Sequence, residues 1–308
     1  MSIRSEAIRI FFTTWAKTGK APGLLYSRIE NHKFPIENRK RHRKLYNGLV
    51  FECDLRDHVQ QQIYFFGAYE PNEVSLFLSL MEPGATVVDA GANIGFYTFL
   101  LGKKVGPEGQ VHSFEPVPDN FAALNRHYAL NGKPANIRLN SVALWNKAEI
   151  LQFGLARQHE NNSGSFHAGK SDDAIKSVAC QAIPLAQYFK EQGLTRLDGI
   201  KMDIEGAELF ALEGARDLLE KFRPVICLEV CRSNARAFDY TPEKLWEALK
   251  PFDYLIYLIG GTRAQSGWIS DFTGLDQRNV LLIPKSRARM LREDWDDKAF
   301  RKTFLRYR

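Results

Sequence analysis

The chain has 308 residues, of which 44% are apolar and 25% charged, as in an ordinary soluble globular protein. No run of eighteen apolar residues occurs, so we expect no membrane span, and the start of the chain lacks the features of a secretory signal. The four cysteines have neither zinc-site nor disulfide spacing, which favours idle thiols in a reducing compartment, and we expect a cytoplasmic protein.

The net charge of +6 is unevenly distributed along the chain. Residues 1–44 hold 11 basic and three acidic side chains, and residues 285–308 hold nine and four, so the middle of the chain is acidic. Basic ends favour anionic surfaces such as phospholipid, lipopolysaccharide or nucleic acid, or they only solubilise. We divide the chain into a basic amphipathic extension (1–47), a central domain (48–285) and a basic tail (286–308).

Residues 4–20 have the pattern of an amphipathic helix. Its apolar stripe, at spacings of three and four, consists of Ile8, Phe11, Phe12 and Trp15. The stripe either packs on its own domain or lies on a membrane surface, and the basic run at 39–44 favours the second interpretation. Peripheral membrane association through residues 4–44, at the inner face of the membrane, therefore stays open.

Residues 48–66 predict short strands or a hairpin, and a helix follows to about residue 80. Residues 86–97 (TVVDAGANIGFY) then predict a buried parallel strand, a tight turn and the start of a helix. Gly91 and Gly95 have no Cβ, so a ligand can lie against the backbone there and the helix can start close to the sheet. The free N–H groups of that helix face the same crevice. This pattern predicts a nucleotide-type cofactor site at the end of the first strand of an open α/β sheet.

The spacing in this segment argues against a nicotinamide cofactor. The dinucleotide fingerprint G-x-G-x-x-G is absent, and Asp89 stands two residues before the first glycine. A carboxylate at the strand tip suits a pyrophosphate poorly, and it suits a sulfonium ligand with a free amino group better. A dehydrogenase of the same topology is therefore disfavoured.

A second strand over 110–114 ends at Glu115, where an acid accepts hydrogen bonds from two ribose hydroxyls; a solvated loop carboxylate is the alternative. A helix over 118–130 and a third strand over 137–144 follow. Residues 148–185 break the α/β rhythm, and their alternating patches predict antiparallel strands joined by a polar loop at 159–167.

The fourth strand, over 199–203, ends at Asp203, which faces the cofactor crevice. Asp203 holds either the amino group of the ligand or a substrate hydroxyl, whereas Glu205 and Glu208 are also explained as helix-start acids. A helix to about residue 222 leads to a fifth strand that places Glu229 at the same sheet edge. Asp203 and Glu229 lack a third ligand, so we expect no metal. Thr241 caps a further helix to about residue 249, and strands over 254–259 and 279–283 complete the sheet.

Two segments, DAGANIGFYT and KMDIEGAE, resemble the FkbM family of class I S-adenosylmethionine-dependent methyltransferases, and the resemblance extends over residues 65–285. It implies a Rossmann-like α/β fold whose seven-stranded, mostly parallel sheet has an antiparallel last strand. To this the chain adds a β insertion after strand three and a basic N-terminal helical extension. The implied reaction is methyl transfer from S-adenosylmethionine to a hydroxyl of a sugar, glycan, glycolipid or natural-product acceptor.

The resemblance and the reasoning above give one set of cofactor-binding residues. They are Tyr69, Glu70, Asp89, Gly91, Ala92, Asn93, Gly95, Phe96, Tyr97, Glu115, Pro116, Asn120, Ala143, Leu144 and Asp203. The family places Ala143 and Leu144 by the adenine, and its N-x-G-x-S insertion makes residues 148–185 a substrate-side lid. A base is needed for the acceptor hydroxyl. The catalytic candidates by location are Asp203, Glu229, His159 and His167.

One rival function stays open, a nucleic-acid methyltransferase or RNA-binding protein that uses the basic ends. The amine-binding motif [DNS]-P-P-[FYW] is absent, which argues against methylation of base nitrogens, and we do not expect a nucleic-acid partner. A small-molecule, sugar or glycolipid acceptor is the expected partner, and the sequence leaves a homo-oligomer open.

Overall fold

The computed structural model describes residues 40–156, 166–168, 174–260 and 265–290. Within 153–177 and 288–290 this description covers the backbone only. The expected N-terminal helix, His159 and the end of the basic tail therefore lie outside the described residues, as does the side chain of His167.

One large sheet organises the described part of the chain, in the order β13-β12-β14-β11-β10-β3-β4-β5. The strands are β3 Thr86–Ala90, β4 Gln110–Phe114, β5 Ile137–Asn140, β10 Gly199–Met202, β11 Val225–Cys231, β12 Tyr254–Ile259, β13 Gly267–Ile269 and β14 Gln277–Pro284. The strands from β5 to β11 run parallel, and β14 is antiparallel to both of its neighbours. This confirms the predicted mostly parallel α/β sheet with an antiparallel last strand. The sheet has eight strands, not seven, because β13 pairs with β12.

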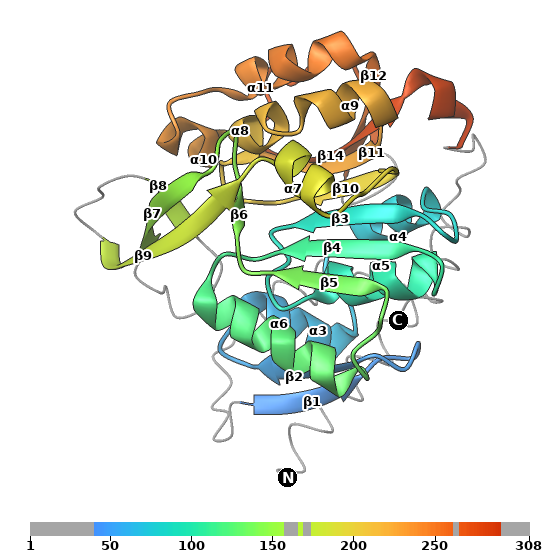
Figure 1. Ribbon diagram of the computed structural model, residues 1–308, viewed down its shortest axis with the longest axis vertical. Helices are drawn as coiled ribbons and strands as arrows, with labels where there is room; N and C mark the ends of the chain where they lie inside the picture. Colours follow the sequence, from blue (N-terminus) through green and yellow to red (C-terminus); the bar gives the residue numbers. More distant parts are fainter. Residues whose placement is uncertain (1–39, 157–165, 169–173, 261–264, 291–308) are drawn as a thin grey trace.

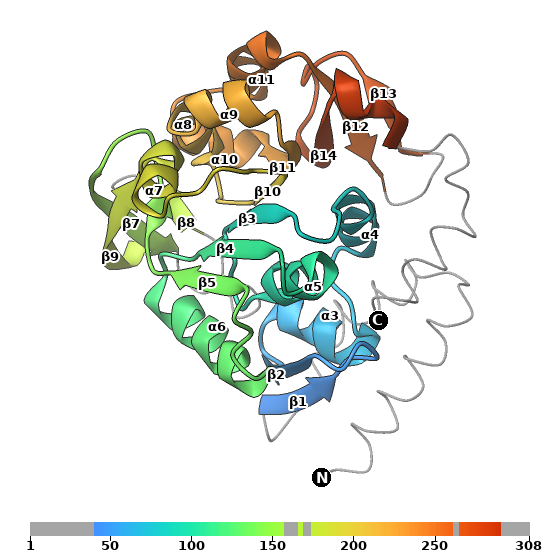
Figure 2. The same cartoon turned by 45° about the vertical axis from the view of Figure 1, so that its right-hand side comes forward.

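Helices cover both faces of this sheet (Figures 1 and 2). One face carries α3 His58–Phe66, α4 Pro71–Ser79, α5 Phe96–Val105 and α6 Pro118–Leu130; the other carries α7 Leu185–Glu191, α8 Glu208–Glu213, α9 Arg216–Phe222, α10 Arg232–Ala237 and α11 Pro242–Leu249. Short 3-10 turns occur at η1 Lys250–Phe252 and η3 Lys285–Met290. Each face has its own hydrophobic core, the first under α3–α6 and the second under α7–α11. Successive strand residues point to opposite faces, so Val87 packs in the first core and Val88 in the second. Because both faces of the sheet are buried, its central strands are continuously apolar instead of alternating.

The segment before the first core strand differs in part from its prediction. The hairpin exists, but it pairs β1 Lys40–Lys44 with β2 Val50–Asp54, and residues 58–66 form α3 instead of a strand. Asp57 caps this helix by accepting a hydrogen bond from the Gln60 N–H, and Gly67 ends it with φ of 71°. The apolar end of α3 is buried in the first core, so packing and caps outweigh the strand-like composition.

A second sheet stands at the carboxyl ends of β3, β4 and β5 (Figure 1). Its order is β6-β9-β7-β8, from β6 Ala143–Leu144, β9 Ala174–Ile183, β7 Glu149–Ala156 and β8 Phe166–Ala168. The antiparallel pairing of β7 with β9 agrees with the predicted insertion. The expected third strand is divided, because β5 belongs to the large sheet and β6 to the second one.

Among the described residues, no helix combines the length and the apolar character that a bilayer crossing needs.

Candidate active site

A cavity opens at the carboxyl ends of β3, β4 and β10, beside the second sheet. It is lined by His58, Val59, Tyr69, Asp89, Ala90, Gly91, Ala92, Asn93, Ile94, Phe96, Tyr97, Phe114, Glu115, Pro116, Asn120, Val142, Ala143, Leu144, Lys201, Asp203, Ile204, Glu205, Ala207 and Phe238. Thirteen of the fifteen predicted cofactor-binding residues are in this lining. The other two, Glu70 and Gly95, are not in the lining.

The two glycines of the first turn are needed for protein packing. Gly91 has φ of 80°, and a Cβ there would stand 1.8 Å from the carbonyl oxygen of Asp203. Gly95 has φ of 94° and precedes α5, where a Cβ would meet Leu124 and Phe99 at 2.5 Å. The sequence argument assigned this space to a ligand and to close approach of the helix. The structure shows that at Gly91 the close neighbour is the tip of β10.

Glu115, at the tip of β4, is held by the backbone. Its Oε2 accepts a hydrogen bond of 2.8 Å from the Asn93 N–H, and its Oε1 accepts one of 2.9 Å from the Val117 N–H. The side chain is buried, and burial raises the pKa of Glu115 to about 7. Asn120 is a third hydrogen-bond partner of this carboxylate, which has about four lone-pair sites in all. The carboxylate is thus fixed in orientation and can still accept hydroxyl donors from a ligand.

Asp89, at the end of β3, is both a lining residue and part of a buried polar network. The Thr98 hydroxyl donates to its Oδ2 at 2.5 Å, and the same hydroxyl lies 2.9 Å from the Ser113 hydroxyl. Burial raises the pKa of Asp89 to about 6. The network couples the first strand to its helix and to β4.

A buried cation lies between two acids at the floor of the cavity. The Lys201 ammonium is 3.3 Å from Asp203 Oδ2 and 5.0 Å from the centre of the Tyr97 ring. Burial opposes its charge, but the attraction of Asp203 and Glu70 outweighs this and raises the pKa of Lys201. The Tyr97 hydroxyl donates to Glu70 Oε2 at 3.0 Å, and Asn279 donates to Glu70 Oε1 at 3.1 Å. Glu70 thereby supports Tyr97 and the Lys201 site from behind.

Acids outnumber this cation on the β10–β11 side of the cavity. Glu205 follows Asp203 in the chain, and Glu229 is on the neighbouring strand β11. Burial, followed by repulsion from Asp203, raises the pKa of Glu205 to about 8 and that of Glu229 to about 9. The Asn234 amide donates to Glu205 at 2.8 Å, and Gln277 donates to Glu229 at 3.2 Å. We call Asp203, Glu205 and Glu229 the acidic wall.

The structure places the remaining catalytic candidates less directly. Glu229 belongs to the acidic wall but is not among the residues that line the cavity. His159 and the His167 side chain are outside the described residues, although the backbone of residue 167 is in β8. Both histidines therefore stay predictions.

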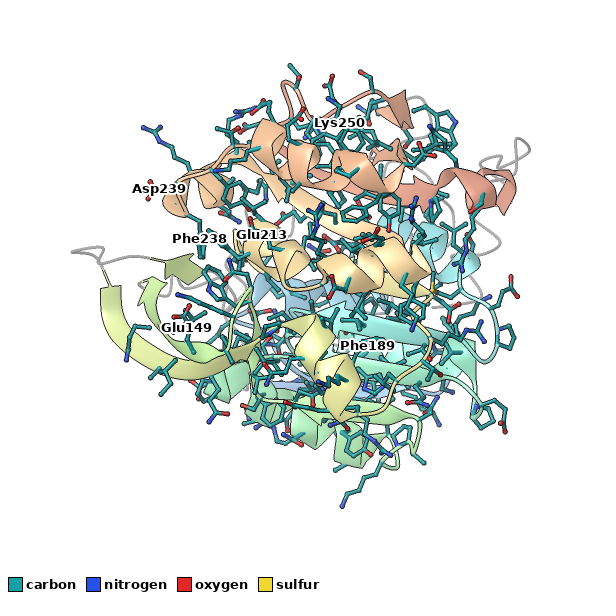
Figure 3. All side chains as sticks on the ribbon, turned by 45° about the horizontal axis from the view of Figure 1, so that its top comes forward. Glu149, Phe189, Glu213, Phe238, Asp239 and Lys250 are labelled. Carbon is teal, nitrogen blue, oxygen red and sulfur yellow. The ribbon has the colours of Figure 1, made fainter. Side chains whose placement is uncertain are left out.

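Several lining residues were missed by the sequence reasoning. Lys201 and Glu205 belong to the KMDIEGAE motif, so the motif itself was an available signal. His58 begins α3, a segment expected to be a strand, and its ring nitrogen is 2.7 Å from the Gln62 amide. Phe238 follows α10, which lies against β8, and Figure 3 shows it on the side of the second sheet. No sequence pattern marks Phe238 or His58.

Comparison with known proteins gives the family. The Methyltransferase FkbM domain matches residues 89–256, more than half of the chain, from the end of β3 to β12. The chain belongs to the FkbM methyltransferase family. The resemblance of the two motifs is thereby confirmed, and the family assignment supports the predicted cofactor, S-adenosylmethionine.

Individual FkbM relatives are distant. Methyltransferase sdnD of Sordaria araneosa is 27% identical over 42% of this chain and 59% of its own length. The 31-O-demethyl-FK506 methyltransferase FkbM of Streptomyces tacrolimicus is 26% identical over 44% and 62%. The 2-O-methyltransferase NoeI of Sinorhizobium fredii is 24% identical over 59% and 74%. The matched part thus spans less than two thirds of the length of the first two.

Proposed function

We propose that this FkbM-family chain is an S-adenosylmethionine-dependent O-methyltransferase acting on a hydroxyl of a sugar, glycan, glycolipid or natural-product acceptor. The observation that carries the proposal is the cavity itself, in which backbone N–H groups orient a buried glutamate beside the glycine turn. Two relatives are named for methylation at oxygen, which supports a hydroxyl as the acceptor group. The cofactor supplies an electrophilic methyl group on a sulfonium centre.

The described residues fit this cofactor by their chemistry. Glu115 offers fixed acceptor oxygens to the two ribose hydroxyls, and the paired backbone of Ala143 and Leu144 offers a buried apolar surface to the adenine. Asp203 and the acidic excess around it favour the positively charged methionine end. A dinucleotide would place phosphates against these carboxyls, which is unfavourable.

The acceptor end of the cavity needs a group that takes the hydroxyl proton. We propose Asp203 and Glu229 for this role on the acidic wall, with His159 and His167 as candidates from the second sheet. Alignment of the hydroxyl oxygen with the methyl carbon supplies much of the acceleration in an in-line transfer. The half-buried Phe238 offers a ring face against which an acceptor can be oriented.

The donor assignment is tested by titration calorimetry of S-adenosylmethionine and S-adenosylhomocysteine. We expect Glu115→Ala to weaken both by about tenfold or more, because charge-assisted hydrogen bonds contribute about 1.5–3 kcal/mol. Glu108→Ala, at an exposed turn, is the matched control and keeps wild-type affinity. Unchanged binding by Glu115→Ala would remove the ribose role, and binding of NAD in place of both nucleosides would overturn the proposed function.

The acceptor class is tested in cells. Mass spectrometry compares the glycans and lipids of cells with and without an active copy of the protein. In cells without it, one species should be lighter by the mass of one CH₂ group, because its hydroxyl is not methylated. An Asp203→Asn variant is expected to behave as the inactive copy. Loss of a methyl group from RNA instead would favour the nucleic-acid alternative.

A further inference from the structure

Glu205 stands in the cavity on a rigid, left-handed turn. Glu205 has φ of 54° and Gly206 has φ of 106°, and a Cβ at Gly206 would lie 2.5 Å from the Asn234 carbonyl oxygen. A glutamate rarely adopts this backbone conformation, so the surrounding structure must hold it there. The turn is therefore a built feature of the site.

Glu208 provides much of that support. Its Oε1 accepts hydrogen bonds from the N–H groups of Ile204 and Gly206, at 3.0 and 3.2 Å. Its Oε2 accepts a hydrogen bond of 3.1 Å from the Tyr240 hydroxyl, which also donates to the Gly206 carbonyl at 2.9 Å. Both carboxylate oxygens of Glu208 thus accept hydrogen bonds that hold the turn, whereas Glu205 lines the cavity. Two glutamates three residues apart have different tasks.

The surroundings of Glu205 contain more acidic than basic side chains. Its one hydrogen-bond donor among the described residues is the Asn234 amide, on Oε2. The ionisable groups that face it are Lys201 on β10, Asp203 directly after β10, Glu208 on α8 and Glu229 on β11. Lys201 is paired with Asp203 at 3.3 Å. Burial and these acids keep Glu205 protonated near neutral pH, with a pKa of about 8.

We propose that Glu205 makes this pocket prefer the cationic methyl donor to the neutral product. The inference rests on the proposed function, since it takes S-adenosylmethionine, with one net positive charge, as donor and uncharged S-adenosylhomocysteine as product. A positive charge within about 4–6 Å lowers the pKa of a carboxyl group by one to three units. Glu205 therefore releases its proton when the donor enters and regains it when only the product is left. The product then lacks an attraction that held the donor, which favours its departure.

The pH dependence of the two affinities tests this role. With a pKa of about 8 in the free protein and a lower one beside the donor, donor affinity rises with pH between about 6.5 and 8.5. In the wild-type protein we expect the ratio of the product Kd to the donor Kd to increase about tenfold over this range, since one pKa unit corresponds to tenfold. Calorimetry in two buffers of different ionisation enthalpy should also detect proton release on donor binding.

Glu205→Gln is the main variant, and exposed Glu220→Gln is its matched control. The amino groups of both nucleosides titrate identically in all three proteins, so comparison between proteins cancels their contribution. In Glu205→Gln, the ratio of the product Kd to the donor Kd should change with pH only as far as the ligands themselves titrate. Donor binding should also release no extra proton in this variant. Glu205→Asp, which keeps the charge, should retain most of the effect and guards against a folding artefact.

Two outcomes decide against the inference and are distinguishable. If Glu205→Gln shows the same pH-dependent ratio as the wild type while both nucleosides bind, Glu205 is not the discriminating group and the proposed function stands. If the wild-type protein binds neither nucleoside at any pH, the proposed function fails and the inference fails with it.

Discussion

The two walls of the cavity are built by different means. On the donor side, backbone N–H groups hold Glu115 at the tip of β4. On the acidic wall, side-chain amides donate to two of the three acids, Asn234 to Glu205 and Gln277 to Glu229. Backbone donors belong to the fold and leave little choice of geometry, whereas each amide is a single substitutable group that lowers the pKa of an acid whose pKa burial has raised. We therefore expect the Glu115 side of the cavity to orient a ligand and the acidic wall to respond to the charge of a ligand.

The largest expected effect is at Gly91, where the turn after β3 meets the backbone of Asp203. Gly91→Ala places a Cβ against the Asp203 carbonyl in a left-handed backbone, and we expect a loss of more than about 3 kcal/mol in the free energy of unfolding. Gly132→Ala is the matched control, because it has the same φ of 80° with open space around it. It should cost about 1–2 kcal/mol, the cost of the left-handed conformation alone. Equal losses in denaturant titrations would show that backbone conformation, not the close approach, makes Gly91 necessary.

A smaller effect separates the two glutamates of the KMDIEGAE motif. Glu208→Ala leaves the Ile204 and Gly206 N–H groups without their acceptor and removes one of the two acceptors of the Tyr240 hydroxyl, so it should lower the free energy of unfolding by about 2 kcal/mol. Denaturant titration at pH 6.5 measures it. Glu205→Ala at the same pH is the comparison and should cost clearly less, because Glu205 accepts a single hydrogen bond. A reversed order would contradict the division of tasks.

The next effect concerns stability against pH. The pKa of Glu205 is about 8 in the folded protein and near 4.5 when unfolded, so between these values the folded state binds the extra proton. Stability therefore falls as pH rises through this window. Glu205→Gln should remove about 2 kcal/mol of the loss between pH 6.5 and 8.5, measured by thermal or denaturant unfolding. An identical pH dependence in the variant would mean that Glu205 does not titrate there.

The smallest effect adjusts the acidic wall without removing an acid. The Asn234 amide lowers the pKa of Glu205, so Asn234→Ala should raise that pKa by about half a unit to one unit. The pH at which donor affinity rises should shift upward by the same amount. Asn125→Ala, on the outer surface of α6, should leave the profile unchanged. A downward shift would show that the amide does not stabilise the charged carboxyl.

Much of the fold follows from the sequence because its signals are local. The strand over 110–114 and the helix over 118–130 are predicted to the residue, since turns and apolar runs bound them. Residues 58–66 were expected to form a strand because of their aromatic composition, and the Asp57 cap, which marks the start of a helix, was not considered. The short strand β13 has three residues and no pattern of its own; pairing with β12 creates it.

The candidate site divides in the same way. Glu115 and the glycine turn were predictable, because strand tips and spacing mark them. The hydrogen bonds that hold Glu70 could not be predicted, because their donors are distant in sequence, with Tyr97 on α5 and Asn279 on β14. Lys201 is an interior strand residue, and only the sheet register shows that it stands beside Asp89.

The position of β14 has a consequence for where this protein can be shortened. The family match stops at residue 256, yet β14 lies between β11 and β12 and carries Gln277 and Asn279. A polypeptide ending at the matched boundary would leave a gap in the middle of the sheet and would remove the amide donors to Glu70, Glu73 and Glu229. The smallest piece expected to fold with an intact pocket therefore extends through residue 284.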